Sequence, residues 1–187
     1  MYYKVKVKDH IRLSPKLYGE KTKDAIIKEV KTSYSGYISR DFGIVIDVCG
    51  VDDVKDGIII PEDGATYYKT EFSLLTFKPE LQELAIGKIK DITDFGAFLG
   101  LGPIEGMIHI SQTMNDFVSF SKDKQLQGKE THRSLRVNDE CVGKIIAVSY
   151  KDINNPKIGI TMRQEGLGKK DWIIEDLTNP KKAKVQK

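Results

Sequence analysis

The apolar positions of the first eighty residues follow a strand-like spacing and then a helix-like one. Over residues 1–13, apolar side chains share one parity and basic side chains share the other, which predicts a half-buried strand. Ser14-Pro15 then supplies a pair that commonly begins a helix. After Gly19, apolar residues recur at three- and four-residue steps, which predicts an amphipathic helix over residues 21–33.

Residues 43–77 return to the pattern of strands. We expect one strand over residues 43–51 that ends in an acidic turn at Asp52-Asp53, a short strand over residues 57–60, and a third over residues 66–77. A strand, a helix and three strands in this order predict an α+β unit, in which one main helix packs on an antiparallel sheet.

Beyond residue 81 the spacing predicts an all-β unit. Five short apolar runs separated by turn residues suit a small five-stranded closed barrel, which removes exposed sheet edges. The candidate strands cover residues 87–92, 96–101, 105–111, 140–149 and 157–162. Residues 114–138 are polar and too long for a hairpin loop, so we expect them to cross the outside of the barrel. We read residues 119–131 within them as a mobile surface loop, with a functional insertion as the alternative.

Lys78-Pro79 is the expected hinge, because proline removes a backbone donor and restricts the residue before it. At 187 residues the chain is long enough for two small domains. We expect these domains to cover residues 1–80 and 81–187, the second ending in a charged tail at residues 181–187.

The amino-acid composition excludes fewer classes of function than the spacing of apolar residues does. The chain is 40% hydrophobic and 30% charged, with a net charge of +3, and residues 1–80 hold equal numbers of basic and acidic side chains. A site made only of phosphate-neutralising charge would need a larger basic excess. No apolar run suits a membrane span or a signal peptide. Cys49 and Cys141 form no disulfide framework and lie in apolar runs where buried thiols are common, so we expect a cytoplasmic protein.

The sequence lacks the residue combinations of an enzyme. The three histidines, His10, His109 and His132, and the two cysteines have no zinc-site spacing, and no phosphate-binding glycine loop or nucleophile elbow is present. The acidic pairs Asp52-Asp53 and Glu62-Asp63 stand beside glycine and proline, as solvated turns do. We therefore expect a non-catalytic protein with no cofactor and no metal site.

Residues 87–111 hold the strongest candidate for function. Gly96 keeps side-chain bulk away from a neighbouring strand, so that Phe95 and Phe98 can both reach one open face of the barrel. His109 arrives at that face from the next strand. Aromatic rings beside lysines bind single-stranded nucleic acid, because bases stack on the rings while lysines meet the backbone. Core packing of these three side chains is the alternative. The basic side chains expected on or near the face are Lys88, Lys90, Arg133 and Lys144.

Residues 82–163 closely resemble the S-one family of RNA-binding OB folds, on the motifs GKIKDITDFGAFLGL, EGMIHIS and KIGITMR. The resemblance implies that Phe95, Phe98 and His109 line the RNA face. It also implies that Lys157, the basic residue that opens the last strand, takes part in binding. Family members often close the fourth strand with an aspartate, whereas this chain has Ser149 and a longer loop.

Nearly the whole chain resembles a family of polymerase stalk proteins, which comprises the larger stalk components of archaeal RNA polymerases (the E-prime subunits) and the seventh-subunit family of eukaryotic polymerases. The resemblance rests on the first half ending in LLTFKPELQELAIGKI, on the long insertion, and on RQEGLGKKDWI near the end. It implies a ribonucleoprotein-like amino-terminal domain that docks on the polymerase core near the clamp. It further implies a heterodimer with the smaller stalk component, the F subunit, and a barrel that receives the emerging single-stranded RNA transcript.

Residues 57–64 indicate where such docking takes place. Gly57, Ile59, Pro61 and Gly64 belong to an apolar turn of the kind that a protein contact at a domain tip needs, with a buried strand as the alternative. Other functions remain for the same barrel: an RNA-binding subunit of an exosome or of a translation initiation complex, or the RNA clamp of a nuclease or phosphorylase. Against a nuclease, this sequence shows no obvious carboxylate cluster that could bind a catalytic metal ion.

Overall fold

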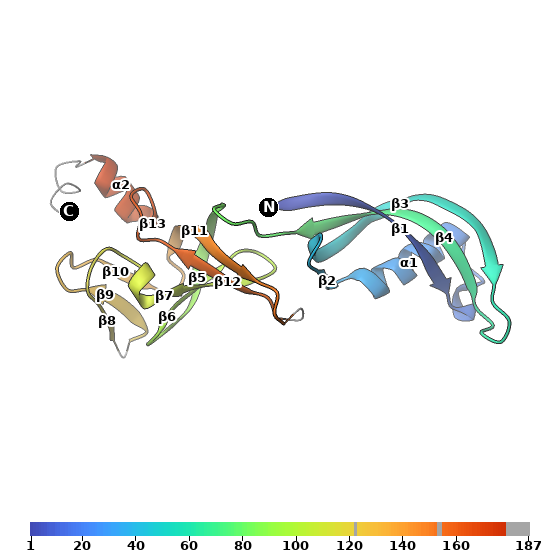
Figure 1. Cartoon of the computed structure of the whole chain (residues 1–187), viewed down its shortest axis with the longest axis horizontal. Helices are drawn as coiled ribbons and strands as arrows, with labels where there is room; N and C mark the ends of the chain where they lie inside the picture. The colour runs from blue at the N-terminus through green and yellow to red at the C-terminus, as the bar shows by residue number, and fades with distance from the viewer. Residues whose placement is uncertain (122, 153–154, 179–187) are drawn as a thin grey trace. The chain divides into compact units, whose positions relative to one another are not determined.

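The computed structural model describes residues 1–121, 123–152 and 155–178, and the chain divides into two compact units, Met1–Lys78 and Pro79–Lys187 (Figure 1). The division falls between Lys78 and Pro79. In the described residues, the first unit has one sheet and the second has two, and each unit has its own set of buried apolar side chains.

The amino-terminal unit is an antiparallel sheet with one long helix. Its elements are β1 (Tyr2–Leu13), η1 (Pro15–Leu17), α1 (Thr22–Tyr34), β2 (Ile38–Ser39), β3 (Gly43–Ile59) and β4 (Thr66–Phe77). The four strands lie in the order β1-β4-β3-β2. The strand expected over residues 1–13, the helix expected over residues 21–33 and the α+β architecture are confirmed.

The apolar stripe of α1 packs on one face of this sheet. Ile26 and Val30 of the helix are fully buried in one cluster with Val45, Phe72 and Leu74 of the sheet. Burying a large apolar side chain contributes about 1.5–3 kcal/mol to folding, so this cluster is what holds the helix in place.

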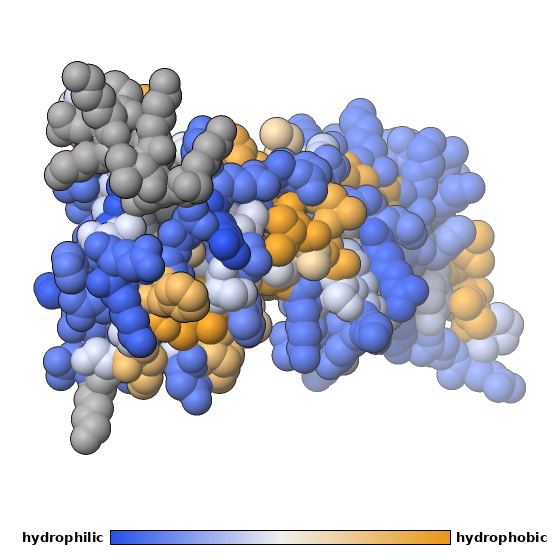
Figure 2. All heavy atoms as spheres, turned by 60° about the vertical axis from the view of Figure 1, so that its left-hand side comes forward, coloured by the Kyte–Doolittle hydropathy of each residue, from blue (hydrophilic) through white to orange (hydrophobic). Residues whose placement is uncertain are grey.

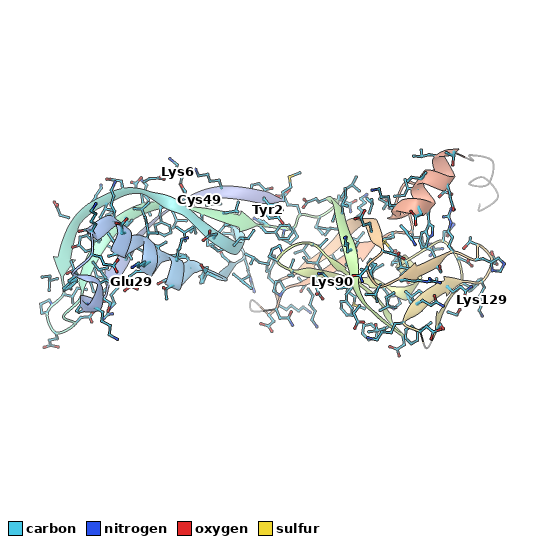
Figure 3. All side chains as sticks on the ribbon, turned by 180° about the vertical axis from the view of Figure 1, so that it is seen from behind. Tyr2, Lys6, Glu29, Cys49, Lys90 and Lys129 are labelled. Carbon is cyan, nitrogen blue, oxygen red and sulfur yellow. The ribbon has the colours of Figure 1, made fainter. Side chains whose placement is uncertain are left out.

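The other face of the sheet is polar. Lys8 Nζ lies 2.6 Å from Glu71 Oε1, which raises the pKa of the lysine and lowers that of the glutamate. Figure 3 shows Lys6 and Cys49 on this face and Glu29 on the helix side. The alternation of lysines and apolar residues in β1 therefore separates a solvated face from a buried one.

β3 is one continuous strand, which corrects the expectation of two strands separated by an acidic turn. Its pairing with β4 shifts register at four places, one of them between Val51 and Asp53. Ser73 of β4 donates a hydrogen bond to Asp52 Oδ2 at 2.9 Å. Bulges of this kind let a long strand bend without losing its partner, so the acidic pair stays in the sheet.

The turn expected at Glu62-Asp63 is confirmed, and it joins β3 to β4. Asp63 lies 2.7 Å from a guanidinium nitrogen of Arg12 and also accepts a hydrogen bond from Tyr67. Hydrogen bonds from Arg12 and then from Tyr67 lower the pKa of the Asp63 carboxyl to about 2. The carboxylate thus ties the turn to β1 and β4.

The carboxy-terminal unit contains a five-stranded closed barrel, as the sequence predicts. The barrel strands are β5 (Leu84–Thr93), β6 (Gly96–Gly100), β7 (Glu105–His109), β11 (Glu140–Ser149) and β12 (Lys157–Thr161). The order β12-β7-β6-β5-β11 closes through an additional pairing of β12 with β11, and only β7 and β12 run parallel within it. The largest fully buried side chains include Ile89, Leu99, Ile108, Ile145 and Ile160.

The segment between β7 and β11 has strands of its own, so the expectation of a mobile loop over residues 119–131 is wrong. It contains η2 (Ile110–Gln112) and a three-stranded antiparallel sheet of β8 (Val118–Ser121), β9 (Gln125–Gly128) and β10 (Ser134–Arg136). Leu126 and Leu135 are fully buried. The Asp116 carboxylate accepts hydrogen bonds from the Thr131 backbone at 2.9 Å and from its hydroxyl at 2.8 Å. Buried leucines and a bonded carboxylate order a segment that is polar overall.

The described part of the chain ends with β13 (Gly168–Lys169) and α2 (Lys170–Thr178). Trp172 of α2 is buried. The charged tail expected at residues 181–187 lies outside the described residues. Within the described ranges, none of the helices combines the length and the apolar composition that a bilayer crossing needs.

The two cysteines differ, although the sequence suggests two buried thiols. Cys141 of β11 is buried, and burial raises the pKa of its thiol to about 12. Cys49 of β3 is exposed on the polar face of the amino-terminal sheet. A reagent in water can therefore reach one thiol and not the other.

We expect one fast-reacting thiol in the native protein when it is mixed with a chromogenic disulfide reagent at pH 8, and two after denaturation. Cys49→Ser removes the fast reaction, whereas Cys141→Ser, the matched control, leaves it unchanged. Two equally fast thiols in the native protein would contradict the burial of Cys141.

Candidate nucleic-acid interface

The turn between β5 and β6 brings the backbone of β6 very close to that of β7. Gly96 pairs with His109, and a Cβ atom at Gly96 would lie 2.1 Å from the carbonyl oxygen of Ile108. Only glycine fits at this distance. The Ile110 N–H donates to the Phe95 carbonyl at 2.9 Å. The residue before Gly96 is therefore joined to the residue after His109.

The two phenylalanines lie on the outside of the barrel. Ala97 and Leu99 of β6 point inward and are fully buried, and Phe98 between them points outward and is half-buried. Phe95 precedes the strand and is 47% exposed. The ring centroids of Phe95 and Phe98 are 6.1 Å apart with planes at 89°, an edge-to-face pair. Phe95 is therefore not packed in the core, which was the alternative for this side chain.

His109 is exposed at the end of β7, on the strand next to Phe98. Its Nδ1 lies 2.8 Å from the Ser111 hydroxyl and accepts the Ser111 N–H at 3.3 Å, which caps η2. This bonding fixes the orientation of the ring, and Nε2 is the ring nitrogen through which the side chain can contact a ligand.

Lys90, one of the predicted lysines, lies on β5, the strand that pairs with the strand of Phe98. Its side chain crosses Gly100 of β6 on the outer surface, where a Cβ atom at Gly100 would lie 2.9 Å from Lys90 Cε (Figure 3 labels Lys90 on β5). Lys88, also exposed, has its ammonium 3.8 Å from Glu140 of β11. Its charge is shared with that carboxylate.

Lys157 and Lys144 lie further from the rings. Lys157 opens β12, and Ile158 pairs with Gly106, so Lys157 lies beside the start of β7 whereas His109 lies at its end. Lys144 lies on β11, which is not a neighbour of β6 in the barrel. The barrel therefore spreads the basic side chains around the aromatic pair instead of gathering them.

The structure gives Arg133 a different place from the one the sequence suggests. Its guanidinium donates to the carboxylate of Asp176 and lies 5.6 Å from the ring centroid of Trp172, both on α2. Its side chain is only 21% exposed. Arg133 is thus part of the packing of α2 against the segment after β7, and it does not join the aromatic face.

Sequence reasoning missed an ion pair beside Phe98. Asp91 of β5 pairs with Phe98 in the sheet, and its carboxylate accepts a hydrogen bond from Lys124 Nζ at 2.9 Å. This bond lowers the pKa of Asp91. Lys124 belongs to the turn between β8 and β9, and nothing in the order of the sequence indicates that this turn reaches β5.

Arg163 is a second residue that the sequence did not single out. It is exposed just after β12, and its Nε donates to Asn115 Oδ1 at 3.1 Å, on the segment that follows η2. The KIGITMR motif contains this arginine, so its place at the end of the last strand is a signal that could have found it. In the described ranges, histidine, cysteine and acidic side chains form no cluster of three that could hold a metal ion.

The tip of the β3–β4 hairpin, which comprises the end of β3 and the turn that follows it, is apolar and exposed. Ile58, Ile59 and Ile60 are 62%, 70% and 46% exposed, so the alternative of a buried strand does not hold here. Figure 2 shows hydrophobic groups at the faded end of the amino-terminal unit, where Figure 1 places this tip. Of the four residues singled out from the sequence, Gly57 and Ile59 lie at the end of β3, and Pro61 and Gly64 lie in the turn, the last with φ +61°.

Comparison with known proteins finds a domain family in each half of the chain. The S1 RNA binding domain matches residues 78–154, and the SHS2 domain found in the N terminus of Rpb7p/Rpc25p matches residues 8–64.

Two relatives match nearly the whole chain, and a third matches two thirds of it. The DNA-directed RNA polymerase subunit Rpo7 of Sulfolobus acidocaldarius is 30% identical over 183 residues, 97% of this chain and 100% of the relative. The subunit Rpo7 of Saccharolobus solfataricus is 30% identical over 177 residues, 94% of this chain and 98% of the relative. The DNA-directed RNA polymerase III subunit RPC8 of Bos taurus is 25% identical over 126 residues, 67% of this chain and 62% of the relative.

We predict that Gly96→Ala destabilises the barrel unit by about 1–3 kcal/mol, because the added methyl group must push β6 away from β7. Chemical denaturation measures the effect. Gly50→Ala is the matched control, since a Cβ atom at Gly50 would have no neighbour within 4 Å. Equal stabilities of the two variants would show that the close approach of β6 and β7 is not required.

Proposed function

Because the chain belongs to the Rpo7 family of DNA-directed RNA polymerase subunits, we propose that it is the component of the polymerase stalk that binds the emerging RNA transcript. The two resemblances noted in the sequence, to S-one RNA-binding domains and to polymerase stalk proteins, are confirmed by these relatives and domain families. The family is one of non-catalytic subunits, so this role consists of binding and assembly.

The observation that carries RNA binding is the pair of outward-facing rings at Phe95 and Phe98, with His109 on the next strand. A flat unpaired base can stack on an exposed ring, and stacking tolerates any base because each has a π-face. Lys90, whose side chain crosses Gly100 two residues from Phe98 on β6, would supply a positive charge for the backbone of a strand that crosses the rings. This arrangement suits a subunit that must accept every transcript in turn.

Paired charges support stacking as the main contribution to affinity. Lys88 faces Glu140 at 3.8 Å and Lys124 faces Asp91 at 2.9 Å, so part of the local positive charge is already neutralised. We expect moderate affinity, weak sequence preference and a shallow dependence on salt, because few phosphates would be neutralised.

The exposed isoleucines at the tip of the β3–β4 hairpin support a second role, docking on the polymerase core near the clamp. Exposed side chains of this size lose unfavourable hydration when a partner covers them. The family resemblance supplies the other partner that we propose, the smaller F subunit of the stalk, in a heterodimer.

The alternatives within RNA-binding proteins are less well supported. A subunit of an exosome or of a translation initiation complex would share the barrel and join it to a different amino-terminal domain. Here the relatives named as polymerase subunits match both halves of the chain at once. A nuclease is disfavoured by the same membership.

We predict that Phe95→Ala lowers affinity for a single-stranded oligouridine about 5- to 150-fold, and that adding Phe98→Ala lowers it further, because stacking contributes about 1–3 kcal/mol per base. Fluorescence anisotropy measures the affinity. The control is Ile174→Ala on α2, which removes a side chain of similar exposure away from the rings. Unchanged affinity in the double variant, with an unchanged melting temperature, would reject the aromatic face.

We predict that Ile58→Asp with Ile59→Asp weakens association with the polymerase core at least tenfold and leaves RNA affinity unchanged. Both side chains are exposed, so a charge there costs little in folding and much in a buried contact. Co-purification with core polymerase measures the effect, and a one-to-one complex with the co-expressed F subunit serves as the folding control. Normal core association of the variant would contradict docking through the tip of the β3–β4 hairpin.

A further inference from the structure

The sheet of the insertion ends beside the aromatic face. Lys124 lies in the turn that joins β8 to β9, and its ammonium is 2.9 Å from the carboxylate of Asp91. Asp91 is the residue of β5 that pairs with Phe98 of β6. A second connection follows β10, where Asn138 donates to the Ile89 carbonyl at 2.8 Å. Figure 1 shows β8 and β9 alongside the part of the barrel formed by β5 and β6. The insertion is thus fixed along one border of the face.

One aromatic residue of the insertion lies on the side of its sheet that packs inward. Phe120 of β8 pairs with Leu126 of β9, and Leu126 pairs with Leu135 of β10, so the three side chains share one face. Both leucines are fully buried, whereas Phe120 is 41% exposed. Further along this face, a Cβ atom at Gly128 would lie 3.0 Å from Met114 Sδ, so the face covers the segment after η2.

Position along β8 places Phe120 toward the rings. Val118, which pairs with Gly128, lies at the Met114 end of the strand. Phe120 lies two residues nearer to the turn that carries Lys124, hence nearer to Asp91 and Phe98. β8 is the edge strand of its sheet, so nothing of that sheet lies beyond Phe120. A half-exposed ring at the border of a buried face, on the hairpin that Lys124 ties to Asp91 beside Phe98, is suited to stacking.

We propose that Phe120 is a further RNA-stacking residue and that the β8–β9 hairpin forms a second wall of the RNA-binding face. This proposal rests on the transcript binding proposed above and extends it to a longer stretch of RNA. Phe95 and Phe98 hold one part of the strand, and Phe120 holds a base that has passed beyond Phe98. The Asp91–Lys124 pair positions the hairpin and cancels a negative charge that would otherwise repel the RNA backbone.

The test uses the full chain and oligouridines of about four and about ten nucleotides, with affinity measured by fluorescence anisotropy. Phe120→Leu keeps an apolar side chain for packing and removes the π-face, and Phe120→Trp keeps the π-face. We expect Phe120→Leu to lower affinity for the longer oligomer about fivefold or more, with little change for the shorter one. We expect Phe120→Trp to bind both oligomers as the unmodified chain does.

Phe117→Leu is the matched control, because Phe117 lies on the same insertion just before β8 and is 74% exposed. It should change neither affinity. Normal binding of both oligomers by Phe120→Leu, alongside a loss in Phe95→Ala, overturns this inference and leaves the proposed function intact. Equal losses in Phe117→Leu and Phe120→Leu also overturn it, as does a Phe120→Leu variant that loses polymerase-core association and keeps its RNA affinity.

Discussion

The close approach of β6 to β7 at Gly96 is the contact on which the proposed RNA-binding face depends. A Cβ atom there would lie 2.1 Å from a backbone oxygen, so no other residue allows the two strands to pair at this point. Their pairing brings Phe95 and His109 to the same end of the barrel, and the alternation of β6 turns Phe98 outward while its neighbours fill the core. One backbone contact thus places three side chains, which come from β6, from β7 and from the turn before β6.

Part of the positive charge of the carboxy-terminal unit is paired with carboxylates. The ammonium groups of Lys88 and Lys124 have carboxylate partners, and Arg133 is bound to Asp176 on α2. We expect such a surface to attract RNA weakly by charge and to bind it mainly through the rings. Weak electrostatics and sequence-tolerant stacking fit the proposed role, in which a transcript moves along the subunit.

The sequence predicts the helices and strands in which the spacing of apolar residues directly reflects which side chains are buried. The five barrel strands and α1 follow apolar periodicity, and their bounds agree with the structure to within a few residues. The continuity of β3 escapes prediction, because bulges opposite β4 keep Asp52 and Asp53 in the sheet. The strands of the insertion escape it too, since two leucines in a polar segment do not stand out until their pairing is known. The surroundings of Arg133 and Cys49 were not predicted either, because the identity of a residue does not say which neighbours it will have or whether it will be buried.

Intermolecular nuclear Overhauser effects between phenylalanine rings and an oligouridine test the central claim most directly. With phenylalanine labelled selectively, we predict contacts from the rings of Phe95 and Phe98 to base protons, and none from the buried ring of Phe72 in the amino-terminal unit. The account would be contradicted if bound RNA gave nuclear Overhauser effects only to protons near Lys144 and Lys157 and none to the rings of Phe95 and Phe98.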